Sequence, residues 1–272
     1  MPLFLANIHY FPLIIFGLFL AASFVVAIIM VKDESRKTGC DPEHMQDLCF
    51  WLLIAAIFGS RILYVTANPT RFVSDPLEVF RIWNGGIAYY GGIIASVIIS
   101  IVFINKTRMP LGRTFDTLAP AIAIGHFFGW LGCFFSGSCR GYLSDLPWLV
   151  KIAHPDALAS PTASLHPTSL YLATSNLVIF CILLYYKDRR RFNGQIFWLY
   201  ALLYGISRFL IEALLGNNGE PAVVDLSVRP VTSLSVAITA LAALIYLNHN
   251  AKRRDAVPAA NETSGSSINS VT

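Results

Sequence analysis

The sequence predicts an all-α, polytopic membrane protein with seven transmembrane helices, its N-terminus external and its C-terminus cytoplasmic. Hydrophobic residues make up 55% of the 272 residues and charged residues only 13%, about half of the roughly one quarter that is usual in soluble domains. The chain also contains seven apolar runs, each near the roughly 20 residues that cross the hydrocarbon core as a helix. These runs are residues 11–30, 48–65, 87–104, 115–135, 169–186, 196–215 and 231–248.

Each run carries or adjoins a feature by which it can be recognised in the sequence. The first, residues 11–30, is a helix rather than a signal peptide, because no basic segment precedes it and no small-residue cleavage site follows it. The second carries Arg61, and the third opens with the glycine-rich residues 85–92. The fourth ends in the glycine-rich residues 129–141, the fifth follows a long loop, and the sixth carries Arg208. The seventh leads into a polar tail of small residues.

The predicted organisation is one transmembrane domain followed by a tail. Residues 1–248 form the seven-helix domain, with external loops at 66–86 and 136–168. The polar composition of residues 249–272 predicts a disordered cytoplasmic tail.

The positions of lysine and arginine give the orientation. Three or more basic residues occur in each of the segments 32–37, 106–113, 187–191 and 252–254, whereas the connections on the opposite side carry five in all. Because cytoplasmic loops are enriched in lysine and arginine, these four segments are predicted to be cytoplasmic. The net charge of +4 therefore reflects topology, and we expect no binding to nucleic acid.

Charged residues inside the apolar runs indicate a functional site, because a charge in the bilayer is costly. At 1.5 Å per residue, Arg61, Arg208 and Glu212 come out about 20, 18 and 24 Å above the cytoplasmic boundary, in the outer half of the membrane. Tyr90 lies in the same layer, one turn into the third run. We expect a shared cavity near the external face that takes an anionic lipid, since guanidinium groups match phosphate oxygens bidentately.

Purely structural roles also fit some of these residues. Arg208 and Glu212 are spaced i, i+4, so they also fit a structural ion pair. The glycines Gly85, Gly86, Gly91 and Gly92 fit either a backbone that approaches a lipid head group or simple close packing of helices.

Several motifs in fixed order resemble the prolipoprotein diacylglyceryl transferases of bacterial inner membranes. The resemblance implies a multi-pass enzyme of the bacterial cell inner membrane, without cofactor or metal ion. It would transfer a diacylglyceryl group from phosphatidylglycerol to the lipobox cysteine of a preprolipoprotein signal peptide and release glycerol phosphate. The motifs are Gly59-Ser60-Arg61-Ile62-Leu63-Tyr64-Val65, Asn84-Gly85-Gly86 through Tyr90-Gly91-Gly92, His166-Pro167-Thr168-Ser169-Leu170-Tyr171 and Tyr204-Gly205-Ile206-Ser207-Arg208 through Glu212.

The resemblance and the residue chemistry together predict the site. The catalytic candidates are Arg208, Tyr90, Glu212 and Cys133. The substrate-binding candidates are Arg61, Tyr64, Gly85, Gly86, Gly91, Gly92, Ser136, Ser138 and Tyr171.

The chain departs from the family pattern where the chemistry is expected. Tyr90 stands where the family has a histidine that is a proposed base, and Trp130 stands where it has an arginine. These departures keep two alternatives open: a relative with an altered acceptor that uses Cys133 or Tyr90, or a non-catalytic lipid-binding membrane protein. A small-solute transporter is disfavoured, because the charges lie near one face and not at the midplane.

Cysteine and histidine positions allow further alternatives. Cys133 and Cys139 are predicted to lie at or beyond the external surface, where they fit a disulfide, a reactive thiol or small apolar fillers. His126 lies deeper, and we favour a hydrogen-bonded core histidine there over a proton relay.

Overall fold

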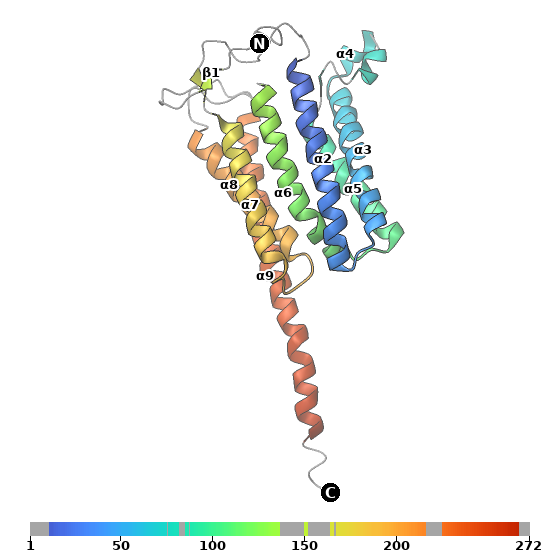
Figure 1. The fold of residues 1–272 in the computed structure, drawn as a ribbon, viewed down its shortest axis with the longest axis vertical. Helices are drawn as coiled ribbons and strands as arrows, with labels where there is room; N and C mark the ends of the chain where they lie inside the picture. The colour runs from blue at the N-terminus through green and yellow to red at the C-terminus, as the bar shows by residue number, and fades with distance from the viewer. Residues whose placement is uncertain are drawn as a thin grey trace. The chain divides into compact units, whose positions relative to one another are not determined.

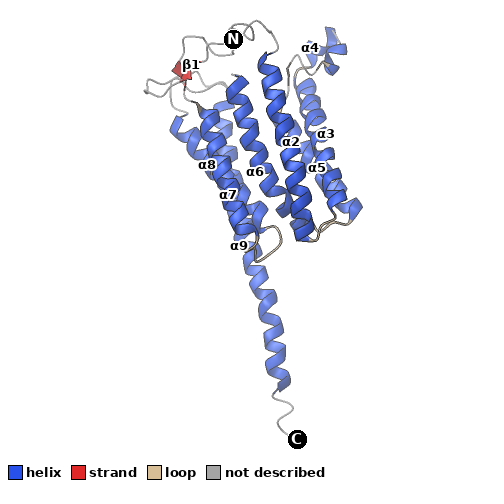
Figure 2. Cartoon of the chain, in the orientation of Figure 1, coloured by secondary structure: helices blue, strands red, loops and turns tan. Residues whose placement is uncertain are grey.

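The computed structural model describes residues 11–74, 76–81, 85, 86, 88–136, 150, 151, 164, 165, 167–215 and 225–266. This part of the chain is helical apart from one two-residue ladder, in which β1 (Val150–Lys151) pairs antiparallel with β2 (Ser164–Leu165) (Figures 1 and 2). The helices are α2 (Phe11–Thr38), α3 (Pro42–Ala67), α4 (Pro69–Ser74), η1 (Pro76–Phe80), α5 (Tyr89–Thr107), α6 (Leu111–Ser136), α7 (Thr168–Lys187), α8 (Gln195–Leu215) and α9 (Asp225–Ser266).

Seven of the described helices are long and apolar enough to cross a membrane, namely α2, α3, α5, α6, α7, α8 and α9. The predictions of an all-α fold and of seven spans are confirmed. Many large apolar side chains on these helices are exposed, including Leu18, Ile62 and Ile245. An exposed apolar side chain is expected on a helix whose outer surface faces lipid.

Two segments contain helix that the sequence did not predict, namely the loop at residues 66–86 and the tail. Residues 66–86 contain α4 and η1, which the sequence did not predict. Helix α9 continues past Asn248 to Ser266, where the sequence predicts a disordered tail. Alanine, lysine and arginine in residues 251–256 have high helix propensity, which fits the start of this continuation, whereas nothing in the sequence explains its extent past Pro258.

The chain divides into two compact units, and the first to consider is Ile28–Thr114. Here Asp41 begins α3, because its carboxylate accepts a hydrogen bond from the Glu43 amide (2.9 Å) with Pro42 at the first helical position. Helices α3 and α5 then pack backbone to backbone through glycine. A Cβ at Gly59 would lie 2.6 Å from the Gly91 carbonyl oxygen, and one at Gly92 would lie 3.1 Å from that of Ala56. For Gly91 and Gly92, close helix packing is therefore the role that the structure shows.

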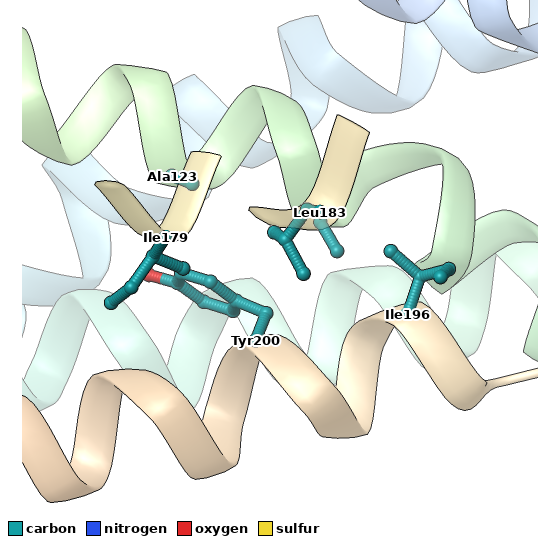
Figure 3. Close-up of a cluster of buried hydrophobic side chains, with 6 residues drawn as sticks. Ala123, Ile179, Leu183, Ile196 and Tyr200 are labelled. Carbon is teal, nitrogen blue, oxygen red and sulfur yellow. The ribbon is translucent and has the colours of Figure 1, made fainter. Parts of the chain in front are cut away.

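The second unit comprises Met1–Ala27 and Phe115–Thr272. Its core lies where α6, α7 and α8 meet (Figure 3). Helices α8 and α9 also pack closely, since a Cβ on Gly205 would lie 2.9 Å from the Ser233 carbonyl oxygen. The buried side chains of the core are Ala119, Ala123, Ile179, Leu183, Ile196 and Tyr200.

Asp116 fixes α6 to the start of α8. Its carboxylate accepts hydrogen bonds from three backbone amides, those of Gly194 (2.8 Å), Ile196 (2.9 Å) and Phe197 (3.1 Å). The amides in the first turn of a helix have no partner within that helix, and a carboxylate there also meets the positive end of the helix dipole. This cap sets the position from which α8 carries its polar residues through the unit.

Candidate functional site

The centre of the site in the unit that contains α6 to α9 is the ion pair between Arg208 and Glu212 on α8. Arg208 Nε donates to Glu212 Oε1 at 2.9 Å, and both side chains are largely buried. Ser233 on α9 donates to Glu212 Oε2 at 3.4 Å. Arg208 Nη1 donates to the Tyr204 hydroxyl at 3.2 Å. The structural pair that was one of the two alternatives for these residues is present, and it holds the guanidinium in a defined orientation.

Trp130 on α6 completes the surroundings of Arg208. The guanidinium carbon lies 5.5 Å from the centroid of the Trp130 ring, a distance at which a cation is attracted to the ring face. The arginine that the family pattern has at this position is thus replaced by an aromatic ring that supports a different arginine. The result is a cation inside the membrane with a carboxylate on one edge and a ring on its face.

His126, Tyr200 and Tyr204 form an aromatic group that continues the polar network toward the core. The Tyr200 hydroxyl and His126 Nδ1 are 2.6 Å apart. The Tyr204 ring stacks on His126 at 5.2 Å between centroids and on Tyr200 at 5.8 Å. The prediction that His126 is a hydrogen-bonded core histidine is confirmed.

Sequence reasoning did not assign Tyr200 or Tyr204 to the site, although a signal was present. Tyr200, Tyr204, Arg208 and Glu212 follow one another at intervals of four, which places them along one face of α8. Polar and aromatic groups on a single stripe of an otherwise apolar span could have identified all four.

The other unit contains Arg61, which is buried with 6% of its surface exposed. Among the described residues, the hydrogen bonds of its guanidinium all go to backbone carbonyl oxygens of η1 and of the residues that follow it, up to Gly86. Nε donates to Val79 (2.9 Å), Nη1 donates to Gly85 (2.7 Å) and Gly86 (2.9 Å), and Nη2 donates to Arg81 (3.3 Å) and Glu78. This geometry argues against the predicted role of Arg61 as a ligand for a lipid phosphate, because a guanidinium has five N–H groups and five carbonyls accept from it.

The glycines and tyrosines predicted with Arg61 lie in the same unit. Gly85 and Gly86 both have φ of 80°, a conformation that favours glycine. Tyr64 lies beside Arg61, with its ring centroid 5.9 Å from the guanidinium carbon. Tyr90 is 44% exposed on the first turn of α5, and its ring lies edge-on to that of Tyr89 at 5.7 Å.

The remaining predicted residues belong to the ends of α6 and α7. Ser136 is buried in the last turn of α6, where its hydroxyl donates to the Cys133 carbonyl oxygen at 3.2 Å. Tyr171 is half-buried in the first turn of α7. Ser138 and Cys139 lie outside the described residues.

The predicted catalytic role of Cys133 does not agree with its state in the structure. Cys133 is disulfide-bonded, whereas Cys40, Cys49 and Cys181 carry free thiols. A sulfur in a disulfide has no thiolate to offer, so the proposed role of Cys133 as a reactive thiol in catalysis is wrong for this form of the protein. Of the three alternatives for Cys133, the disulfide is the one present.

Comparison with known proteins identifies relatives over most of the chain. The family model described as prolipoprotein diacylglyceryl transferase matches residues 3–246. A protein of Finegoldia magna is 35% identical over 200 residues, covering 73% of this chain and 77% of the relative. One of Thermosynechococcus vestitus is 32% identical (73% and 76% covered), and one of a Nostoc species is 30% identical over 259 residues (91% and 90% covered). All three are named phosphatidylglycerol-prolipoprotein diacylglyceryl transferase.

Proposed function

Because the chain belongs to the prolipoprotein diacylglyceryl transferase family, we propose that it transfers a diacylglyceryl group from phosphatidylglycerol to the lipobox cysteine of a preprolipoprotein. The reaction takes place at the external face of the bacterial inner membrane. In the transfer, the cysteine sulfur forms a bond to the terminal glyceryl carbon of the diacylglyceryl group. The bond from that carbon to the phosphate oxygen breaks, its electron pair stays on the oxygen, and glycerol phosphate leaves.

The observation that supports this proposal is the arrangement around Arg208. A largely buried arginine in a membrane span indicates a functional role, because removing its charge from water is costly even when a carboxylate compensates the charge. Glu212 and Tyr204 each accept a hydrogen bond from Arg208 and so orient its guanidinium. A pre-oriented cation stabilises the negative charge that grows on the leaving phosphate in the transition state. We assign this role to Arg208.

A proton acceptor is the second requirement, because a cysteine thiol with a normal pKa of about 8.5 is mostly protonated at neutral pH. We propose Tyr90 for this role, acting as its phenolate after its own hydroxyl proton has gone to solvent, so that the thiol proton then passes to the phenolate oxygen. It is accessible on the first turn of α5, and its neighbour Tyr89 provides a matched control for substitution.

The proposal is tested by complementation of a bacterial strain depleted of its own diacylglyceryl transferase. We expect growth and lipoprotein maturation to be restored by the wild-type chain and lost in Arg208→Ala. The matched control is Arg189→Ala, since Arg189 is an exposed arginine whose guanidinium lies 4.0 Å from the Tyr185 ring. No rescue by a wild-type chain that accumulates in the membrane would contradict the proposed activity.

The alternative of a non-catalytic lipid-binding protein gives a different result in vitro. Purified protein would then bind phosphatidylglycerol in an Arg208-dependent manner without releasing glycerol phosphate. This alternative is tested because Tyr90 and Trp130 stand where the family pattern has a histidine and an arginine.

A further inference from the structure

We propose that Arg61 is a positioning residue that holds the segment from η1 to the start of α5 in place, and that it does not bind the lipid phosphate. The structural part of this proposal stands on the contacts of Arg61 and does not depend on the proposed function. Only the expected effect on turnover rests on the proposed function.

The N–H groups of the Arg61 guanidinium are all used within this segment. Its five hydrogen bonds go to five different backbone carbonyls between Glu78 and Gly86. A phosphate that took two of the N–H groups would have to displace backbone carbonyl oxygens from the guanidinium of Arg61, which is 6% exposed. Hydrogen bonds to a charged donor are stronger than those between neutral groups, and a phosphate would replace at least two of them, so the guanidinium is committed to the segment.

Gly85 and Gly86 provide two of the five carbonyl oxygens. With φ of 80° at both Gly85 and Gly86, the chain turns their carbonyl oxygens to the same atom, Nη1 of Arg61. Gly86 is also needed for space, since a Cβ there would lie 2.5 Å from Tyr64 Cε1 and 2.8 Å from Arg61 Nη1. The requirement for glycine at these two positions therefore follows from the binding of an internal cation.

Two aromatic rings lie beside the Arg61 guanidinium. The guanidinium carbon lies 5.4 Å from the ring centroid of Phe72 on α4 and 5.9 Å from that of Tyr64 on α3. Phe72 is 7% exposed, and its ring meets that of Tyr64 edge-on at 6.1 Å. Arg61 therefore ties α3 to α4 through ring contacts and to η1 through hydrogen bonds.

This arrangement also reaches the start of α5. The Ala88 amide donates to the Ser60 carbonyl oxygen at 3.1 Å, one residue before Arg61. The segment is thus anchored to α3 at both its Gly85-Gly86 turn and its end. Helix α5 begins with the next residue, Tyr89, and Tyr90 follows. Loss of Arg61 is expected to release the turn that presents Tyr90.

The substitution Arg61→Lys distinguishes a positioning role of Arg61 from a role in phosphate binding. An ammonium keeps the positive charge but has three donors on one nitrogen, so it cannot reproduce a planar fork that reaches five carbonyls. A phosphate ligand would tolerate Arg61→Lys better than Arg61→Gln. A positioning residue would tolerate neither.

The test is hydrogen exchange, measured by mass spectrometry on purified protein in lipid-free detergent micelles, for peptides that cover residues 76–88. We expect both Arg61→Lys and Arg61→Gln to speed exchange in this segment by about tenfold or more. Arg61 holds the carbonyl oxygens, and without it the hydrogen bonds of nearby amides, such as Arg81 to Glu78 and Ala88 to Ser60, open locally. The control is Lys106→Gln, which removes an exposed positive charge from α5 in the same compact unit; its exchange over residues 76–88 should match the wild type. Gly86→Ala keeps Arg61 and should give the same acceleration, so it decides the question if the Arg61 variants do not accumulate.

Wild-type exchange rates in Arg61→Lys and Arg61→Gln, or in Gly86→Ala, would overturn the proposal. So would an unchanged segment together with a raised KM for phosphatidylglycerol and an unchanged kcat. If the wild-type protein shows no transfer, the proposed function fails, yet the exchange measurement still decides the role of Arg61.

Discussion

Arg208 and Glu212 lie one turn apart on α8, with Nε and Oε1 at 2.9 Å, and a third group, the Ser233 hydroxyl of α9, reaches the other carboxylate oxygen at 3.4 Å. The pair brings a cation into a membrane span without leaving its charge uncompensated. Because Glu212 is bonded on both oxygens, the carboxylate also joins α8 to α9.

Removing one partner of this pair should lower the free energy of unfolding more than replacing both partners does. Glu212→Ala leaves a buried cation without its carboxylate, and we expect it to lower the free energy of unfolding by about 3 kcal/mol. The double variant Arg208→Met, Glu212→Met should be more stable than Glu212→Ala, because no unpaired charge stays buried. Denaturant unfolding in detergent measures both. A double variant as unstable as the single one would contradict this view of the pair.

Tyr200→Phe should weaken the core of the same unit by about 1 kcal/mol, since it removes the hydroxyl that lies 2.6 Å from His126 Nδ1 and keeps the ring. Tyr185→Phe is the control, because Tyr185 is 61% exposed. Thermal unfolding of the two variants side by side gives the comparison. Equal stability of the two would show that the hydrogen bond to His126 contributes nothing.

Gly205→Ala should separate α8 from α9. The new Cβ would lie 2.9 Å from the Ser233 carbonyl oxygen and 3.0 Å from the Ala237 amide nitrogen, and both are backbone atoms that cannot turn away. We expect a loss of about 1–3 kcal/mol, as for other overpacked positions. Gly129→Ala is matched in type but has no atom within 4 Å of the new Cβ, so it should be neutral or slightly stabilising. Equal unfolding curves for the two alanine variants would refute this account of the α8 and α9 contact.

Tyr90→Phe tests the proposed proton acceptor. If Tyr90 takes the thiol proton, the variant should lose about 100-fold or more in kcat, with little change in KM for phosphatidylglycerol. Tyr89→Phe alters the adjacent exposed phenol and should keep wild-type turnover. Full kcat in Tyr90→Phe would remove this residue from the mechanism.

Much of the architecture was predictable because apolar length alone identifies a span. Each of the seven apolar runs corresponds to one helix of the structure. The i, i+4 spacing of Arg208 and Glu212 indicated that an ion pair was one of the alternatives, and the pair is present. The partners of Arg61 were not predictable, since they are backbone carbonyls and carry no side-chain signal. Helices α4 and η1 were missed because six and five residues are too few to show a period. That Arg61 and Arg208 share one layer near the external face stays a prediction, because the structure describes their two units separately.

The most direct test of the transferase assignment is release of glycerol phosphate from phosphatidylglycerol by the purified protein, in the presence of a peptide that carries a lipobox cysteine. We expect release that depends on the peptide thiol, falls by about 100-fold or more in Arg208→Ala and is unchanged in Arg189→Ala. Release at the wild-type rate by Arg208→Ala, or none by well-folded wild-type protein, would contradict the assignment of Arg208 as the group that stabilises the leaving phosphate.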